Sequence, residues 1–372
     1  MAALDPDRID ACAGLIRARF APLAKKRVQT APVQDLLPYL DFLGEGYRAR
    51  LIPFEVSSES CLRADYTLSV ALDIIAGRLT PEALWYDDYV FRGDYKQKAV
   101  EAVHREVGVE LFAEKNALDA ESNLIAAAIA AASDAGVAKV SLRFADIGLM
   151  HAVIDALPLS DSRRSALKRA FATPTAFHRA IDDAKNAARF DLPEGYAWAQ
   201  LSEDEAEQAV LKILQSEGAP VIGARTPGEI ARRLTSKARE ARTGLADDQA
   251  KILHDLANVV APIEQALPRI AALAAQLGAD VSGHVERWRE RIASLAAHQV
   301  ECSEAVFDAN LGRGLSYYDG MAFELSDAKS QLWLGGGGRY DSLLSRLSGG
   351  VAHASALGAM MRPDRLAEAS AA

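Results

Sequence analysis

The sequence contains few cysteines and no pattern that would put them to use. Cys12, Cys61 and Cys302 are far apart and odd in number, and no Cys-x-x-Cys or Cys/His spacing typical of zinc occurs in the 372 residues. Isolated cysteines of this kind are expected to be reduced thiols of a cytoplasmic protein. The N-terminus has no basic segment followed by an apolar core, which argues against a signal peptide. No apolar run is long enough to span a bilayer, so no membrane segment is predicted.

Basic residues are also fewer than acidic ones. The chain has 42 Lys and Arg residues against 51 Asp and Glu residues, which gives a formal net charge of -9. Affinity for a phosphate backbone comes mainly from clustered Lys and Arg side chains. The acidic balance therefore argues against a broad nucleic-acid surface, although it permits a local basic patch.

Signatures of cofactors and metals are missing as well. The run Gly335–Gly338 lacks the Lys-Ser/Thr of a phosphate-binding loop, and no Gly-x-Gly-x-x-Gly or Gly-x-Ser-x-Gly occurs. The seven histidines are scattered, so neither a metal site nor a nucleophilic triad is predicted. The four glycines leave two interpretations open, because a backbone without side chains allows close approach by either a neighbouring strand or a ligand.

The chain divides into three zones that differ in their predicted secondary structure. Helix-like and strand-like patterns mix in residues 1–157, residues 158–298 are nearly all helical, and strand patterns return over 299–372. Within the helical zone, Ser202 to Glu205 and Thr226 to Glu229 read as capping boxes. Strands, a helical block and strands again predict one α+β domain, formed by 1–157 and 299–372, that carries a helical insertion.

Several strands are predicted in the two core segments. The most relevant to the site are Tyr47–Glu55, ending at Pro53, and Val103–Phe112, with its alternating pattern. Leu315–Leu325 contains an Asp-Gly pair between two β-prone arms, which predicts a hairpin turning at that pair. Gln331–Leu334 is predicted to add a further strand.

Two carboxylates on one predicted strand form the first candidate site. Glu106, Gly108 and Glu110 project to the same face because strand side chains alternate. Two carboxylates that flank a glycine make a small acidic floor suited to an α-amino or imidazolium group. A solvated face of the sheet is the alternative.

A second group of polar residues precedes a predicted helix. Arg63, Asp65 and Thr67 can share one face, and Thr67 can also cap the helix 68–76. Arg313 supplies a guanidinium fork for a carboxylate or phosphate. Arg313 and Tyr318 are five residues apart, so both can line one pocket only if the strand starts after Arg313 or bulges there.

These pieces together resemble the histidyl-tRNA synthetase family of class II aminoacyl-tRNA synthetases. Residues 313–324 and 337–343 are similar to the two histidine-specific motifs, and Leu62–Thr67 is similar to the family's Leu-Arg-Pro-Glu-Gly-Thr. The three general class II motifs have weaker counterparts at 47–55, 91–110 and 358–366. The resemblance implies a class II aminoacyl-tRNA synthetase-like antiparallel sheet flanked by helices.

The resemblance also implies a histidine-binding pocket. Its predicted residues are Asp65, Thr67, Arg92, Glu106, Glu110, Arg313, Tyr317, Tyr318 and Tyr340. Asp65, Thr67 and Glu110 stand where the family holds the α-amino group. Tyr318 and Tyr340 stand near the imidazole. Arg313 stands where the family contacts the histidine carboxylate and the reacting phosphate, and Glu106 replaces a glutamine.

The departures from the family argue against catalysis. Arg362-Pro363 replaces a glycine that makes room for adenine, so we expect an obstructed nucleotide site and a distorted strand-to-helix turn. A second arginine of motif 2 is replaced across 99–102, and the chain ends six residues after Leu366, where the synthetases continue into an anticodon-binding domain. These losses resemble the regulatory subunits of ATP phosphoribosyltransferase, as do Asp119-x-Glu121 and Asp146–Leu149.

This second resemblance implies a non-catalytic role in a glycosyltransferase complex. The chain would pair with a short catalytic subunit that makes phosphoribosyl-ATP in the first step of histidine biosynthesis. It would dimerise through motif 1, join a hetero-octamer and carry feedback inhibition by L-histidine, without tRNA, membrane or cofactor. Two alternatives are a truncated synthetase-like enzyme that activates histidine and a binding module that senses uncharged tRNA.

Overall fold

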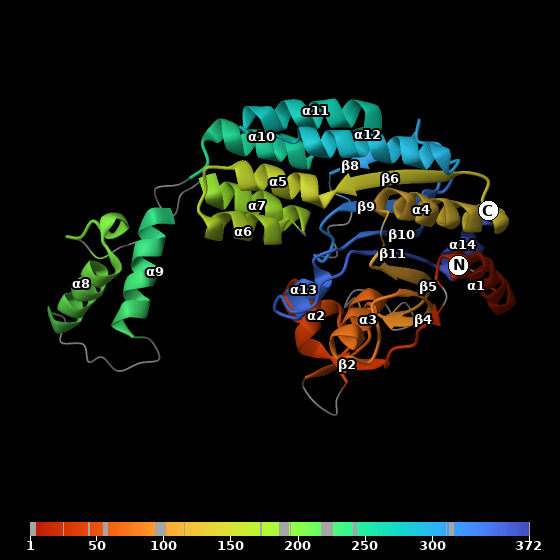
Figure 1. Cartoon of the computed structure of the whole chain (residues 1–372), viewed down its shortest axis with the longest axis horizontal. Helices are drawn as coiled ribbons and strands as arrows, with labels where there is room; N and C mark the ends of the chain where they lie inside the picture. The colour runs from red at the N-terminus through yellow and green to blue at the C-terminus, as the bar shows by residue number, and fades with distance from the viewer. Residues whose placement is uncertain are drawn as a thin grey trace. The chain divides into compact units, whose positions relative to one another are not determined.

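The computed structural model describes most of the chain. The described residues are 5–24, 26–43, 45–54, 59–93, 102–114, 116–171, 173–185, 193, 195–216, 226–240, 244–309, 311 and 316–371. The chain forms two compact units (Figure 1). The first unit comprises 1–151, 258–272 and 281–372, and the second comprises 152–257 and 273–280.

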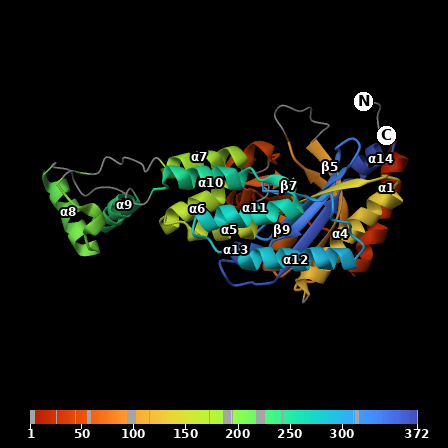
Figure 2. The same ribbon diagram turned by 90° about the horizontal axis from the view of Figure 1, so that it is seen from above.

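The first unit is built on a nine-stranded sheet with the order β1-β4-β5-β11-β10-β9-β6-β8-β7 (Figures 1 and 2). The strands are β1 (Lys26–Arg27), β4 (Ala83–Phe91), β5 (Val103–Phe112), β6 (Val140–Asp146), β7 (Val260–Pro262), β8 (Val306–Asp308), β9 (Met321–Asp327), β10 (Trp333–Arg339) and β11 (Ala356–Met361). All pairs are antiparallel except β1–β4 and β6–β8. The predicted α+β class with a large antiparallel sheet is therefore confirmed.

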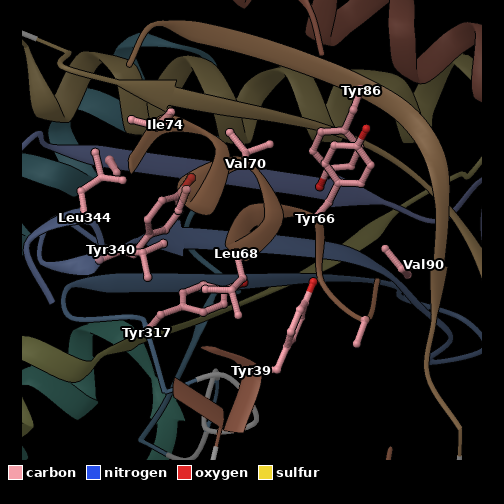
Figure 3. Packing of buried hydrophobic residues seen from close by; sticks show 14 of the residues in the cluster. Tyr39, Tyr66, Leu68, Val70, Ile74, Tyr86, Val90, Tyr317, Tyr340 and Leu344 are labelled. Carbon is pink, nitrogen blue, oxygen red and sulfur yellow. The ribbon is translucent and has the colours of Figure 1, made fainter. Parts of the chain in front are cut away.

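The two faces of the sheet are covered by different helices. On one face α1 (Pro6–Phe20) contacts β4 and β5, while α4 (Ala117–Asp134) contacts β11. The other face packs against α3 (Tyr66–Ile75) and α13 (Leu343–Leu347) in one buried cluster (Figure 3). The remaining elements of this unit are η1 (Ala21–Leu23), β2 (Val33–Asp35), α2 (Leu36–Leu43), η2 (Glu45–Arg50), β3 (Ser60–Leu62), α12 (Ser282–Ala297) and α14 (Pro363–Ala369).

The glycine run forms the centre of the sheet. Gly335–Gly338 lie within β10 between β9 and β11, and a Cβ atom on Gly337 would come within 2.1 Å of the Gly358 carbonyl oxygen. A Cβ atom on Gly336 would lie 2.6 Å from the Phe323 carbonyl oxygen. Close approach by neighbouring strands thus accounts for the run.

One predicted strand and one predicted hairpin turn are wrong. Part of the segment expected as Tyr47–Glu55 forms the 3-10 helix η2, and Pro53 makes only an isolated bridge to Cys61; Glu55 lies outside the described residues. The predicted hairpin does not turn at Asp319-Gly320, because residues 316–320 are irregular and β9 begins at Met321. The Asp319 carboxylate instead accepts the backbone N–H groups of Asp341 and Ser342, and β9 pairs with β10.

The described part of the second unit is helical. It contains α6 (Asp161–Ala170), α7 (Pro174–Lys185), η4 (Trp198–Gln200), α8 (Glu203–Ser216), α9 (Pro227–Glu240) and α10 (Asp247–Ala257), while α5 (Ile147–Ala156) and α11 (Ile263–Gln276) belong partly to each unit. Both capping boxes are confirmed: Glu205 N–H donates to Ser202 Oγ at 3.3 Å, and Glu229 N–H donates to Thr226 Oγ1 at 3.3 Å.

The division of the chain differs from the predicted one at the end of the insertion. Helix α12 falls in 158–298 but belongs to the unit that contains the sheet. Its Arg291 donates to buried Glu121 of α4 at 2.7 Å, and its Trp288 indole donates to Asp146 at 2.8 Å. These buried polar contacts hold α12 against α4 and the end of β6. Within the described part of the chain, no helix is long and apolar enough to cross a membrane.

Candidate functional site

A cavity opens on the face of the sheet that α3 covers. Its volume is about 900 Å³, including the open mouth. Seven of the nine predicted site residues line it: Asp65, Thr67, Arg92, Glu106, Glu110, Tyr317 and Tyr318. Tyr340 reaches the site through a hydrogen bond to Glu110. The ninth, Arg313, lies outside the described residues.

Glu110 is buried among uncharged donors. Thr67 Oγ1 donates to its Oε1 at 2.7 Å, and the Tyr340 hydroxyl donates to its Oε2. Burial raises the pKa of the Glu110 carboxyl to about 8, against the opposing effect of these two hydrogen bonds. Gly358 of β11 lies directly opposite, and a Cβ atom there would be 2.1 Å from Glu110 Oε2. The absence of a side chain at Gly358 therefore makes room for this carboxylate.

Asp65 fixes the start of α3. Its Oδ1 accepts the Leu68 N–H at 2.8 Å as the helix N-cap, and its Oδ2 accepts the Tyr317 hydroxyl at 3.2 Å. The prediction that Thr67 could cap this helix is thus wrong: Thr67 lies in the first turn and points to Glu110. Burial raises the pKa of Asp65, while the nearby charge of Arg92 opposes the rise.

Arg63 does not share the pocket with Asp65 and Thr67. Its guanidinium donates to the carbonyl oxygens of Tyr89 and Thr30. The same guanidinium forms an ion pair with Asp88 at 2.9 Å. A strand face shared by the three residues, as the sequence allowed, does not exist because α3 begins between them.

Arg92 and Glu106 form a buried ion pair. Arg92 donates to Glu106 Oε1 at 2.5 Å and to the Ala64 carbonyl oxygen at 2.7 Å. Burial raises the pKa of Glu106, and the charge of Arg92 opposes this rise. The carboxylate of Glu106 already has a cationic partner, whereas that of Glu110 has none within the described ranges.

The acidic floor is divided by a tyrosine that sequence reasoning missed. Tyr86 of β4 pairs with Gly108, between Glu106 and Glu110. Its ring covers the glycine so closely that a Cβ atom on Gly108 would lie 2.3 Å from the ring. Tyr66 stacks on this ring with 3.8 Å between centroids and 9° between planes (Figure 3). The two glutamates consequently occupy separate halves of the floor.

The buried charges of the floor do not balance. Asp65, Glu106 and Glu110 supply three carboxyl groups, each 4% exposed or less, and in the described part of the chain Arg92 is the cation that forms an ion pair with one of them, Glu106. Arg50 also lines the cavity, with its guanidinium 5.2 Å from the centre of the Tyr47 ring. Burying an unpaired carboxylate is costly, which is why the pKa of Glu110 is raised, and a cationic ligand group beside Glu110 would favour its ionised form.

The expected distortion at Arg362-Pro363 is absent. Pro363 occupies the first turn of α14, where proline is well tolerated, and Arg362 precedes it in an extended conformation. The Arg362 guanidinium is bound to Asp364 at 2.6 and 2.9 Å. Its charge contributes, after burial, to lowering the pKa of His104 to about 4. That Arg362 obstructs a nucleotide stays a prediction.

Other lining residues also went unpredicted. Tyr47, Arg50 and Tyr66 come from segments around η2 and α3, whereas Glu324 and Trp333 come from β9 and β10. Strand alternation could have placed Glu324 on the pocket face only if the register against Gly336 were known. Within the described ranges, no group of three His, Cys, Asp or Glu side chains is placed to hold a metal ion.

Comparison with known proteins gives a consistent family. Residues 50–189 and 222–366 match the family model described as Histidyl-tRNA synthetase. The chain is 31% identical over 364 residues to the ATP phosphoribosyltransferase regulatory subunit of a Chelativorans species, with 94% of each chain covered. It is 29% identical to the protein of the same name from Rhizobium rhizogenes, over 97% of this chain and 98% of the relative.

Solved structures share the fold at lower identity. An ATP phosphoribosyltransferase regulatory subunit/histidyl-tRNA synthetase from Bacillus halodurans matches with a TM-score of 0.65 at 17% identity, over 99% of this chain and 81% of that one. The histidyl-tRNA synthetase from Nostoc matches with a TM-score of 0.61 at 16% identity, over 98% of this chain and 72% of that one.

Proposed function

Because the chain belongs to the family of ATP phosphoribosyltransferase regulatory subunits, which have the histidyl-tRNA synthetase fold, we propose that it is a non-catalytic subunit required by a short catalytic subunit of that enzyme. The complex would perform the first step of histidine biosynthesis in the cytoplasm. In this proposal the chain dimerises and joins a hetero-octamer, and it carries feedback inhibition by L-histidine.

The observation that carries the histidine assignment is the buried Glu110 carboxyl, which has no cationic partner among the residues that the structure describes. Thr67 and Tyr340 donate hydroxyl groups to it, and neither brings charge. A histidine molecule in this half of the floor would place its ammonium group between Asp65 and Glu110. Its imidazole would lie toward Tyr318, and Arg313 is the predicted partner of its carboxylate.

Regulation follows by linkage in this proposal. Histidine can shift the complex only toward the state that it binds more tightly, by an amount set by the difference between its two affinities. The pocket lies between α3 and the sheet, and Tyr317, Asp65 and the start of α3 are joined by hydrogen bonds. A ligand whose ammonium group binds Asp65 would therefore act on the position of α3, and in this proposal the two states differ in that position.

Reconstitution separates this proposal from the alternatives. Adding the chain to a purified short catalytic subunit should raise phosphoribosyl-ATP synthesis and make it sensitive to histidine. An unchanged rate together with unchanged histidine sensitivity would sink the proposal. Histidine-dependent pyrophosphate exchange by the chain alone would favour the synthetase-like enzyme, and a gel shift with uncharged tRNA would favour the sensor.

A further inference from the structure

The hydroxyl group of Tyr86 has no hydrogen-bond partner among the residues that the structure describes. Its stacking partner Tyr66 differs, because the Tyr66 hydroxyl donates to the Val28 carbonyl oxygen at 3.2 Å (Figure 3). Among the same residues, the side-chain polar atoms that are both unpaired and fully buried are Arg291 Nη1 and Trp333 Nε1. The unpaired Tyr86 hydroxyl is therefore not fully buried and is accessible from the cavity that Tyr86 lines.

This hydroxyl lies above Gly108, between the two glutamates of β5. A Cβ atom on Gly108 would be 2.3 Å from both Cζ and Oη of Tyr86, so the hydroxyl end of the ring covers the glycine. Glu106 and Glu110 project from the same face of β5, one on each side of Gly108. Two residues along a strand span roughly 7 Å, so a ligand of the size of an amino acid can contact both Glu110 and the Tyr86 hydroxyl. Burial, together with the charges of Glu110 and Glu106, raises the pKa of Tyr86 well above its usual value, so the hydroxyl stays a proton donor.

The charged side chains that line the cavity give it a basic end and an acidic end. Arg50 and Arg92 lie near each other at one end, because the N–H group of Gly93 donates to the Arg50 carbonyl oxygen at 2.8 Å. Glu324 of β9 lies at the other end, and the strands β11 and β10 separate it from β5. A zwitterionic ligand whose ammonium group pairs with Glu110 is therefore stabilised when its carboxylate turns toward the two arginines.

Tyr86 lies between Glu110 and this basic end. Arg92 is bound to Glu106, which is on the other side of the Tyr86 hydroxyl from Glu110. We propose that the Tyr86 hydroxyl donates a hydrogen bond to the carboxylate of the bound amino acid and selects ligands that carry this group. The inference rests on the proposed histidine site and adds a specificity-determining residue to it. Arg313 is the predicted partner of the same carboxylate, whose two oxygens accept several hydrogen bonds at once.

Calorimetry with L-histidine and histamine on the full chain tests this role. Histamine keeps the ammonium group and the imidazole ring but has no carboxylate. Tyr86→Phe keeps the ring that stacks on Tyr66 and removes the donor, so it should weaken L-histidine about ten-fold and leave the affinity for histamine unchanged. Tyr89→Phe, the same substitution on the opposite face of β4, is the matched control and should bind both ligands as the wild type does. Circular dichroism verifies the folding of both variants.

The outcomes separate this role from the proposed function. An equal loss of affinity for both ligands in Tyr86→Phe would make Tyr86 a structural residue and overturn the inference alone, as would an unchanged affinity for L-histidine. Wild-type protein that binds L-histidine no more tightly than histamine would also overturn it, because the carboxylate would then not be recognised. If neither ligand binds the wild type, the histidine assignment fails and the inference fails with it. A ten-fold loss confined to L-histidine supports the inference even where a reconstituted complex shows no response to histidine, a result that contradicts the proposed function alone.

Discussion

Replacing Glu110 by glutamine tests how the pocket recognises a cation. The substitution keeps the size of the side chain and its ability to accept from Thr67, but it removes the ionisable group. In the empty pocket the pKa of Glu110 is raised to about 8, so the carboxyl group is mostly protonated at pH 7. A ligand ammonium group binds well only to the ionised form. Binding of histidine should therefore release the Glu110 proton.

The magnitude follows from the fraction that is ionised. With a pKa of about 8, roughly one tenth of the Glu110 groups are ionised at pH 7 and about one half at pH 8. Apparent affinity is reduced by the fraction that is competent to bind. The affinity of the wild-type protein for histidine should accordingly rise about five-fold from pH 7 to pH 8 through this group. The protonation of histidine itself also changes with pH, but this change is the same for the wild type and Glu110→Gln and cancels when the two are compared.

Calorimetry in buffers of different ionisation enthalpy measures the released protons directly. The wild-type protein should release about 0.9 proton from Glu110 at pH 7 and about 0.5 at pH 8. Glu110→Gln should bind histidine more weakly and lose this release. Glu290→Gln, on the exposed side of α12, is the matched control and should behave as the wild type. Identical proton release by the wild type and Glu110→Gln would refute the reasoning.

Three further predictions concern stability. The folded protein keeps the Glu110 proton up to about pH 8, whereas an unfolded glutamate loses it near pH 4.5. This group therefore makes the free energy of unfolding decrease as the pH rises between those two values. Urea titrations at several pH values should show a smaller decrease for Glu110→Gln than for the wild type. Gly108→Ala forces the Tyr86 ring to move and should cost about 1–3 kcal/mol, seen as a lower thermal midpoint; an unchanged midpoint would mean that the ring adapts freely. Glu121→Ala leaves buried Arg291 and Arg339 without their shared carboxylate and should cost about 3–5 kcal/mol in chemical denaturation, whereas a cost below about 1 kcal/mol would contradict the buried triad.

Sequence patterns predicted those parts of the site that depend on short-range geometry. Alternation along one strand placed Glu106 and Glu110 on the same face, and both line the cavity. The capping boxes at Ser202 and Thr226 were readable because their partners are three residues away. Such features need no knowledge of which strands are neighbours.

Features set by strand register could not be predicted in the same way. Tyr86 divides the acidic floor only because β4 pairs with β5 so that Tyr86 meets Gly108. The hairpin expected at Asp319-Gly320 does not form, because the Asp319 carboxylate accepts hydrogen bonds from the distant backbone N–H groups of Asp341 and Ser342. In each case a long-range contact outweighed the local preference.

The cap of α3 shows a third reason for error. Thr67 and Asp65 are both good capping residues, and the sequence suggested only Thr67 as a cap, for a helix beginning at residue 68. The structure gives the cap to Asp65, because Thr67 is needed within the first turn to donate to Glu110. Thr67, which was predicted both as a pocket residue and as a possible cap, lines the pocket but does not cap the helix.

The central claim is tested most directly by histidine inhibition of a complex reconstituted from this chain and a short catalytic subunit. The measured quantity is the histidine concentration that halves phosphoribosyl-ATP synthesis, compared for the wild type, Glu110→Ala and the control Glu290→Gln. Loss of an ionic partner for the ligand ammonium should raise this concentration about ten-fold or more in Glu110→Ala, with activity of the complex and the control unchanged. Equal histidine sensitivity of all three complexes would contradict the assignment of the effector site to this pocket.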